Sequence, residues 1–229
     1  MACTSAPPVQ RARNPQGQGG RLRAELIAAA DRLLARTGDV EGLSLRAIAR
    51  EVGIATPSIY LHFPDKSALV RAVLEARFAE LAEAVQSAVA ATPEPALRLR
   101  AGCLAYCRFA TEHPNAYRVL FGRVPSTPSQ PVSEQAPAAA ESPAPAAAVY
   151  PGSAAFGFLV DSIATYMQVG LAPDGDPFRA ATNVWTALHG IVSLRSATPG
   201  FPWPPLERQV DDVLSGMVGL RHNPPATEG

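Results

Sequence analysis

Residues 44–66 constrain the fold more than any other stretch of the chain, because their pattern specifies two short helices joined at a glycine. Four apolar residues in the first half follow the i, i+3, i+4, i+7 spacing of one helix face: Leu45, Ile48, Ala49 and Val52. Ser44 is a suitable N-cap for this helix, and Gly53 tolerates the left-handed backbone that ends one. The pattern predicts a short amphipathic helix that stops at Gly53.

A second helix is predicted from Thr56 to Phe63. Thr56 can cap free backbone amides, and Pro57 at the first helical position loses nothing by lacking an N–H group. Ile59 and Phe63 are four residues apart, so we expect both to face the interior. The opposite face then carries hydroxyl, imidazole and small apolar groups.

This outer face consists of Pro57, Ser58, Leu61 and His62, with Tyr60 at its margin. It suits the major groove of DNA, because hydroxyl and imidazole groups bond to base edges and an exposed apolar side chain can contact a thymine methyl. Two helices of this kind around a glycine turn form a helix-turn-helix, which points to duplex DNA.

Pro64 stops the second helix, and Asp65 is a natural N-cap for a long helix that begins at Lys66. Lys66 then adds its charge to a positive helix N-terminus, where phosphate is a natural ligand. The alternative is that Tyr60 only packs and Lys66 is a solvated surface lysine. For an isolated helix pair, this alternative is favoured.

The sequence around the motif favours DNA binding. Residues 42–49 and 52–69, with the order Tyr-x-x-Phe-x-x-Lys at Tyr60, Phe63 and Lys66, closely resemble the DNA-binding domain of TetR-family transcriptional regulators. The resemblance covers about residues 21–70 without a gap through the motif, and it implies a three-helix DNA-binding domain.

The resemblance implies a role for each candidate position. Base-reading or groove-lining roles fall to Thr56, Pro57, Ser58 and His62, and Leu61 stands where many family members place an aromatic contact residue. Phosphate contacts fall to Tyr60 and Lys66, and backbone contacts from the preceding helix fall to Ser44 and Arg46. These roles agree with the faces expected from helical spacing.

The N-terminal segment is basic although the whole chain has a net charge of zero. Residues 1–72 carry ten Arg/Lys against six Asp/Glu, whereas residues 73–229 carry ten against fourteen. Residues 1–20 are rich in Pro, Gln, Gly and Arg and are predicted to be a disordered basic tail. Four arginines in or after it either reach DNA or only aid solubility: Arg11, Arg13, Arg21 and Arg23.

Other classes of protein find little support. No apolar run is long enough for a signal peptide core or a membrane span, so a cytoplasmic protein without a membrane partner is expected. Phosphate-loop, zinc-protease and nucleophile-elbow motifs are missing from the sequence, which predicts no enzyme and no cofactor. The runner-up is a helical small-molecule binding or interaction protein that keeps a TetR-like domain without useful DNA affinity.

An all-α architecture is expected, with a helix-turn-helix domain at 21–66 and a helical ligand-binding and dimerisation domain at 67–223. Helices are predicted from Asp65 to about Ala91, then over 96–112, 115–122, 154–170, 176–194 and 206–220. Residues 124–150 contain six prolines and eight alanines and are predicted to form a mobile loop. This loop is either a lid over a ligand entrance or, as we favour, a tolerated insertion.

Aromatic and soft side chains on the second domain's helices are the candidates for contact with a small, largely apolar effector: Cys103, Tyr106, Cys107, Phe109, Phe156, Tyr166 and Trp185. Cys103 and Cys107 share a helix face, and His113 would complete a thiol sensor or soft-metal site. We favour the simpler interpretation of two buried free cysteines, and no metal is predicted.

The sequence Trp-x-x-x-His-Gly at 185–190 resembles a signature of one class of TetR-family C-terminal domains. The resemblance implies a homodimer formed by the last two helices, with candidate interface residues His189, Val192, Val210, Val213, Leu214 and Met217. His189 is either a ligand contact or, as we favour, a hydrogen-bonded residue of the core or dimer seam. A dimer predicts a palindromic operator, and release by the effector would make the protein a repressor.

Overall fold

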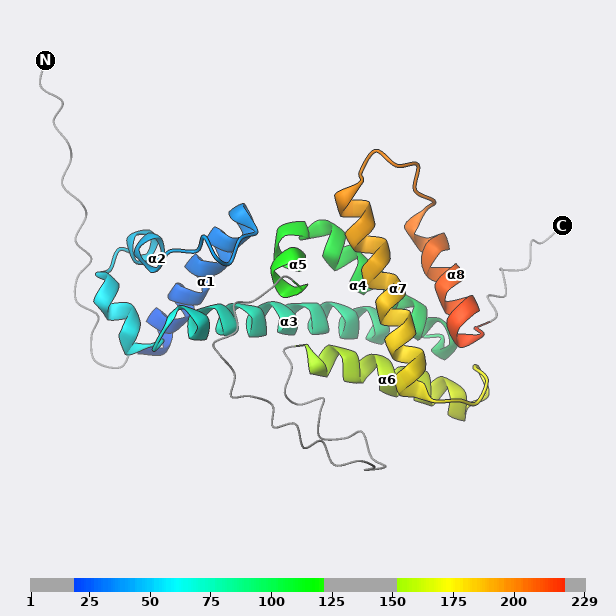
Figure 1. Cartoon of the computed structure of the whole chain (residues 1–229). Coiled ribbons are helices and arrows are strands. Elements are labelled where there is room, and N and C mark those ends of the chain that lie inside the picture. Colours follow the sequence, from blue (N-terminus) through cyan, green and yellow to red (C-terminus); the bar gives the residue numbers. More distant parts are fainter. Residues whose placement is uncertain (1–18, 122–151, 221–229) are drawn as a thin grey trace, which may run out of the picture. The chain divides into compact units, whose positions relative to one another are not determined.

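A computed structural model describes residues 19–121 and 152–220, and all regular structure within these ranges is helical (Figure 1). The all-α prediction is confirmed. In chain order the elements are α1 (Gly19–Thr37), α2 (Leu45–Val52), the 3-10 helix η1 (Thr56–Leu61), α3 (Lys66–Ala90), α4 (Pro95–Glu112), α5 (Pro114–Phe121), α6 (Ser153–Gln168), α7 (Pro177–Ala197) and α8 (Leu206–Val218).

Two compact units make up the chain, and each is described by itself. The first unit holds residues 1–76 and 118–134, and the second holds residues 77–117 and 135–229. Helix α3 is continuous through residues 76 and 77, so its first turns belong to the first unit and the rest to the second.

The first unit is built from α1, α2, η1 and the start of α3. Its apolar interior consists of fully buried side chains: Leu26, Leu34, Ile48, Ile59, Leu69 and Val70. Gly53 ends α2 in the left-handed conformation, with φ of 76°, and its N–H points to the carbonyls of Ala49 and Arg50. The Asp65 carboxylate caps α3 by accepting the Ala68 N–H at 2.7 Å. Both boundaries agree with the sequence-based prediction.

Residues 56–63, here named the recognition segment, differ from the predicted α-helix, because residues 56–61 form a 3-10 helix. Ala55, and not Thr56, occupies the N-cap position, so the capping role predicted for Thr56 is wrong. Ser44 does occupy the N-cap position of α2, but its side chain makes no capping hydrogen bond. Proline within the first turn leaves the segment without one backbone donor, and the six residues of η1 make two turns of a 3-10 helix, a form that proteins use in short pieces.

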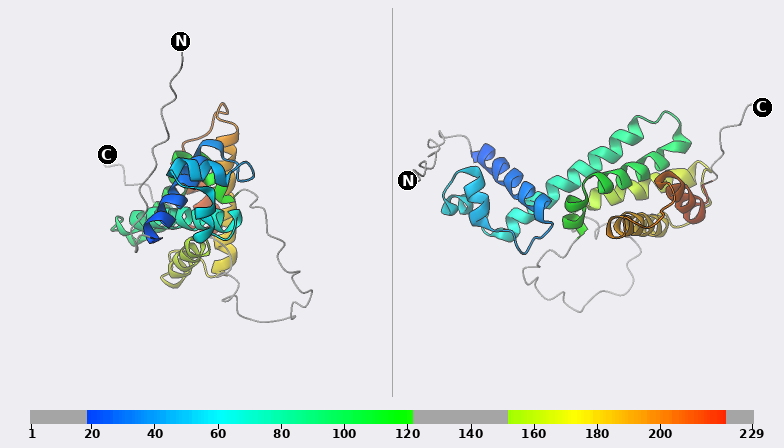
Figure 2. Two further views of the ribbon diagram at one scale, coloured as in Figure 1. Left: turned by 90° about the vertical axis from the view of Figure 1, so that its left-hand side faces the viewer. Right: turned by 90° about the horizontal axis from the view of Figure 1, so that it is seen from above.

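The second unit contains the rest of α3, the start of α5, and α4, α6, α7 and α8. Helices α7 and α8 lie side by side, α4 packs against both, and α6 packs against α7 (Figures 1 and 2). Buried side chains from these helices form its core: Cys107, Ile163, Val184, Leu188, Val210 and Leu214. Asp176 caps α7 by accepting the N–H groups of Phe178 at 2.9 Å and Arg179 at 3.3 Å.

Helix α1 begins at Gly19, two residues inside the tail that the sequence predicts to be disordered. The rest of that tail and the predicted loop at 124–150 lie outside the described residues. In the two described ranges, we find no helix with the length and apolar character needed to cross a bilayer.

Candidate functional site

The outer face of η1 rests on two buried side chains. Ile59 is 0% exposed and Phe63 is 2% exposed, which confirms the inward direction predicted from their spacing. On the other side, Leu61 is 83% exposed and Tyr60 is 54% exposed. The remaining candidates, Thr56, Pro57, Ser58 and His62, are half-buried or exposed. The fold thus presents a mixed polar and apolar surface on a rigid support.

The winding of η1 changes which of these residues are neighbours. A 3-10 helix has about three residues per turn, so side chains three apart align along it. Ser58 therefore shares an edge with Leu61, and Pro57 shares one with Tyr60. An α-helix would align Ser58 with His62, but in the structure His62 lies just beyond η1 as its C-cap.

Lys66 has a definite partner in the first unit. Its Nζ donates a hydrogen bond to the backbone carbonyl of Glu41 at 2.6 Å, which ties the start of α3 to the α1–α2 loop. Asp39 organises the same loop by accepting the N–H groups of Glu41 at 2.9 Å and Gly42 at 3.0 Å. The lysine is therefore not simply solvated. Two of its three N–H donors remain for an anion.

Ser44 and Arg46 lie exposed at the amino end of α2. The free amides of a helix N-terminus carry partial positive charge, and a guanidinium beside them adds a full charge. Neither side chain has a hydrogen-bond or ion-pair partner among the described residues. This end of α2 therefore offers an unneutralised site for an anion.

Two arginines of α1, Arg32 and Arg36, bind the same carboxylate of α2. Arg32 Nε and Arg36 Nη2 donate to the two carboxylate oxygens of Glu51 at 2.8 and 3.1 Å. These contacts, led by the Arg32 hydrogen bond, lower the pKa of Glu51. Sequence reasoning missed this contact, because the i, i+4 arginines are visible in α1 but nothing marks their partner fifteen or more residues later.

The two arginines of the predicted basic arm that the structure describes are also engaged. Arg21 pairs with Glu25 at 3.1 Å, and the Arg23 guanidinium lies 5.0 Å from the centre of the Phe63 ring. The cation–π contact fastens α1 over the end of the recognition segment. Arg11 and Arg13 lie outside the described residues.

Four of the predicted effector contacts are core residues of the second unit. Cys103, Cys107, Phe109 and Tyr166 are all buried. Burial raises the pKa of both thiols, that of Cys107 to about 12, so both remain protonated at neutral pH. The Tyr166 hydroxyl accepts the Leu99 N–H at 3.0 Å and donates to the Pro95 carbonyl, which pins α6 to α4. In the part of the chain that the structure describes, no three His, Cys, Asp or Glu side chains form a metal-binding group.

The other predicted contacts meet in an aromatic cluster of the second unit. The rings of Phe156 and Trp185 are edge-to-face with centroids 5.8 Å apart, and Phe178 packs against Phe156 at 5.5 Å. Trp185 is 37% exposed and Phe178 is 45% exposed. The cluster thus offers partly open aromatic surface. Phe178 was not among the candidates from the sequence. On α7 it lies one helical turn before Thr182 and two turns before Trp185, so it shares a face with Trp185.

A chain of polar groups runs beside these rings. The Tyr117 hydroxyl lies 2.6 Å from the Tyr106 hydroxyl and 2.6 Å from Nδ1 of His189. Burial raises the pKa of Tyr106 to about 12, raises the pKa of Tyr117 as well, and lowers the pKa of His189, so burial favours the uncharged form of all three side chains. Tyr117 was not a sequence candidate, because it reads as one apolar residue among several in α5.

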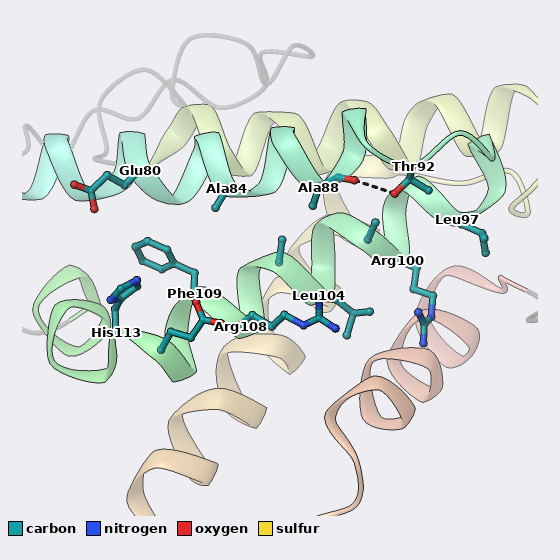
Figure 3. A pocket seen from close by; sticks show the side chains of 13 residues that line it. Glu80, Ala84, Ala88, Thr92, Leu97, Arg100, Leu104, Arg108, Phe109 and His113 are labelled. Atoms are coloured by element: carbon teal, nitrogen blue, oxygen red, sulfur yellow. Dashed lines mark hydrogen bonds between the residues drawn. The ribbon is translucent and has the colours of Figure 1, made fainter.

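A groove of about 740 Å³ lies between α3 and α4 in the second unit (Figure 3). Small side chains line it, two from each helix: Ala84, Ala88, Ala101 and Ala105. Two arginines line it, but Arg100 is paired with Asp211 at 2.5 and 2.9 Å, and Arg108 with Glu207 at 3.3 Å. Of the predicted effector contacts, Phe109 lines this groove and the others do not. The groove is therefore separate from the aromatic cluster.

Three of the six residues predicted for the dimer interface lie in the core of a single protomer. Val192, Val210 and Leu214 are at most 3% exposed within a single protomer, because they pack in the core formed by α4, α7 and α8. Val213 is half-buried and Met217 is 45% exposed, so both remain accessible to a partner. His189 is half-buried against Tyr117.

Comparison with known proteins agrees with this geometry. Residues 26–73 match the family model for bacterial regulatory proteins of the tetR family, and residues 99–219 match that for the tetracyclin repressor-like C-terminal domain. The transcriptional activator FasR of Mycolicibacterium smegmatis is 30% identical over 99 residues, which span 43% of this chain and 45% of that protein. The chain thus aligns with less than half the length of this curated relative.

Solved structures share the fold over most of its length. A protein of unknown function from Rhodococcus sp. RHA1 is 29% identical, with a TM-score of 0.68 over 90% of this chain and all of that one. A TetR-family regulator from Marinobacter aquaeolei VT8 is 18% identical, with a TM-score of 0.62 over 89% of this chain and 99% of that one. The chain belongs to the TetR family of bacterial regulatory proteins, with a helix-turn-helix domain followed by a tetracyclin repressor-like C-terminal domain.

Proposed function

We propose that this regulator binds a palindromic operator as a homodimer and is released from it by a small, uncharged and largely apolar effector. The observation that carries the operator proposal is the outer face of η1, where Leu61 is 83% exposed and Tyr60 is 54% exposed while Ile59 is fully buried on the other side. An exposed apolar side chain beside hydroxyl and imidazole groups can contact a thymine methyl while those groups bond to base edges.

Within this proposal the candidate residues divide into two groups. Sequence is read by Thr56, Pro57, Ser58, Leu61 and His62, which lie on or directly after η1. Phosphates are held by Ser44, Arg46, Tyr60 and Lys66, which border that face or lie at the starts of α2 and α3. In this proposal Lys66 binds two groups, a phosphate and the Glu41 carbonyl, which already accepts one of its N–H groups.

The effector is proposed to contact the aromatic cluster of the second unit. Tyr106, Phe156 and Trp185 are the predicted contacts that retain accessible surface, whereas Cys103, Cys107, Phe109 and Tyr166 support them from the core. The three uncharged groups Tyr106, Tyr117 and His189 beside the rings favour a ligand without formal charge.

Dimerisation is proposed through the exposed sides of α7 and α8, where Val213 and Met217 remain at the surface. One recognition segment buries too little surface for tight specific binding, whereas two-fold symmetry doubles the contacts. For the direction of control we propose repression, in which the bound dimer blocks access to the promoter. Activation is the second candidate, because the similar M. smegmatis protein carries the name of a transcriptional activator.

Selection of bound fragments from a genomic library, followed by affinity measurements at several salt concentrations, tests the operator proposal. We expect selective binding that weakens steeply with salt. Tyr60→Phe and Arg46→Gln should weaken binding to all sequences alike, whereas Ser58→Ala and Leu61→Ala should change sequence preference, with about 1–3 kcal/mol at the affected base pair. If no fragment is bound selectively, the operator proposal fails and a helical small-molecule binding protein becomes the better description.

Transcription in vitro from a promoter that contains a selected fragment separates the two directions of control. Repression predicts fewer transcripts as the protein is added, and activation predicts more. Lys66→Met serves as the weak-binding control, and its response should follow its loss of operator affinity.

A further inference from the structure

A chain of hydrogen bonds connects three helices beside the aromatic cluster of the second unit. The Tyr106 hydroxyl of α4 lies 2.6 Å from the Tyr117 hydroxyl of α5, which lies 2.6 Å from Nδ1 of His189 on α7. The Trp185 side chain also hydrogen-bonds with Tyr106. Because an indole N–H can only donate, the Tyr106 oxygen accepts this bond. The chain thus begins at a ring of the aromatic cluster and ends at an imidazole.

The hydrogens of this chain have two possible arrangements. In the first, Tyr106 donates to Tyr117, and Tyr117 donates to Nδ1 of His189, whose own proton is then on Nε2. In the second, Nδ1–H donates to Tyr117, Tyr117 donates to Tyr106, and the Tyr106 proton needs another acceptor. Among the described residues, Tyr106 hydrogen-bonds with Tyr117 and with Trp185, which cannot accept. The first arrangement is therefore favoured without a ligand, because the second leaves a half-buried donor unsatisfied.

The rings beside the chain favour a planar, uncharged ligand. Trp185 packs edge-to-face on Phe156, and its ring centre lies 6.2 Å from that of His189. Trp185 is 37% exposed and Phe178 is 45% exposed, so a further aromatic ring can pack against them in the same manner. Burial lowers the pKa of His189, and no charged side chain among the described residues counters it. A charged ligand would therefore find no counter-ion here.

We propose that Tyr106 is the specificity-determining residue of the effector site, and that the effector is a neutral aromatic compound with a hydrogen-bond acceptor, such as a carbonyl oxygen, next to its ring. This step rests on the proposed function, which places the effector at the aromatic cluster. The acceptor takes the hydrogen bond of the Tyr106 hydroxyl, and the chain reverses. Tyr117 then donates to Tyr106, and His189 changes from the Nε2–H to the Nδ1–H tautomer by exchanging one proton for another with water.

The reversal selects an acceptor without any change in net charge. Every bond of the chain is kept in the opposite direction, and the Tyr106 hydroxyl gains one new bond, to the ligand. A typical net hydrogen bond corresponds to about fivefold in affinity. A hydrocarbon of the same shape buries similar apolar area but leaves the first arrangement in place.

Acetophenone and isopropylbenzene are matched probes for this selection. They have the same number of non-hydrogen atoms around one ring, and only acetophenone carries a carbonyl oxygen. Binding to the full-length protein is followed by NMR through the indole N–H signal of Trp185. The chain has two tryptophans, and the other, Trp203, lies between α7 and α8, so a Trp203→Phe variant identifies the signal.

Tyr106→Phe should weaken acetophenone binding about fivefold and leave isopropylbenzene binding unchanged, because it removes only the hydroxyl. The ratio of the two affinities is compared between proteins, so the different hydrophobicity of the probes cancels. Tyr166→Phe is the matched control, because its hydroxyl also lies in the second unit but bonds to the backbone around the start of α4. This variant should keep the ratio of the unmodified protein.

The imidazole nitrogens of His189 report the reversal directly. Their NMR chemical shifts distinguish the two tautomers, and a His189→Gln variant identifies the signals. We expect the Nε2–H tautomer in the free protein and with isopropylbenzene, and the Nδ1–H tautomer with acetophenone. In Tyr117→Phe, acetophenone should no longer change the tautomer, because the chain is interrupted.

The inference is overturned if Tyr106→Phe weakens both probes equally, or if acetophenone binds without changing the tautomer of His189. In both cases the proposed effector site stands, because the probes still bind at the aromatic cluster. If neither probe moves the Trp185 signal at concentrations up to its solubility, the proposed effector site fails and the inference fails with it.

Discussion

Two residues of η1 that are separated by a single position have opposite surroundings. Ile59 is fully buried and Leu61 is 83% exposed, although both are aliphatic and similar in size. Apolar periodicity in the sequence identified the buried one, because spacing reports which side of a helix faces the core. Hydrophobicity alone would have placed both inside.

The difference in burial predicts that substitution by alanine changes the free energy of unfolding by different amounts at Ile59 and at Leu61. Ile59→Ala should lower the free energy of unfolding by about 2–5 kcal/mol, since it leaves a cavity under η1. Leu61→Ala should change it by less than about 0.5 kcal/mol, because the side chain is in solvent. Urea unfolding followed by circular dichroism measures both, and equal losses would contradict the assignment of the two faces.

For Lys66, the sequence predicts the position of the residue but not its hydrogen-bond partner. Its place at the start of α3 was predictable from Pro64 and Asp65. Its hydrogen bond to the Glu41 carbonyl was not, because every residue has a carbonyl and no residue type marks this one. The same applies to Arg118 and the Thr37 carbonyl.

The helical elements were largely predictable, since their ends are marked by local chemistry. Asp65 and Asp176 cap the helices that follow them, and Gly38 and Gly53 take the positive φ expected at helix ends. The 3-10 form of η1 was not predictable, because a run of six residues is compatible with either winding. The number of residues per turn then decides which side chains align.

The two glycines at helix ends allow a matched experiment. Gly53 has open space where a Cβ would be, so Gly53→Ala should cost only the strain of a left-handed alanine, about 1–2 kcal/mol. Gly38→Ala adds to similar strain the displacement of the flexible Arg118 guanidinium from the Thr37 carbonyl, so it should cost more by about one hydrogen bond, roughly 0.5–1.5 kcal/mol. Thermal unfolding of the two variants measures the difference. Equal destabilisation would show that Arg118 does not rest on Gly38 in solution.

For the whole molecule, the sequence indicated the family and the fold but could not separate the core of one protomer from a contact between two. The apolar spacing on α7 and α8 is typical of a protomer core and of a dimer contact alike. Only burial among α4, α7 and α8 assigns three of these residues to the core: Val192, Val210 and Leu214. The same limit applied to the effector contacts, where Cys103 and Trp185 look equally suitable in sequence but differ in exposure.

Surface position therefore decides which substitution tests the proposed dimer. Met217→Asp places a charge on a side chain that is 45% exposed, so the protomer should fold while the dimer dissociates, with at least a tenfold weaker association, roughly the cost of burying one unpaired charge. Sedimentation velocity at several protein concentrations measures this. Ser87→Asp, an exposed position on α3, is the control and should remain dimeric. A Met217→Asp protein that is still dimeric would place the interface elsewhere.

The 3-10 form of η1 also sets how much DNA sequence one protomer can recognise. At a rise of about 2.0 Å per residue, its six residues span roughly 12 Å, which corresponds to three or four base-pair steps of about 3.4 Å. A DNA sequence of three or four base pairs recurs by chance throughout a bacterial chromosome. In the proposed homodimer, selectivity in the genome would depend on the distance and symmetry between two such sequences, so inserting or deleting base pairs between the half-sites should harm recognition more than most single substitutions within one.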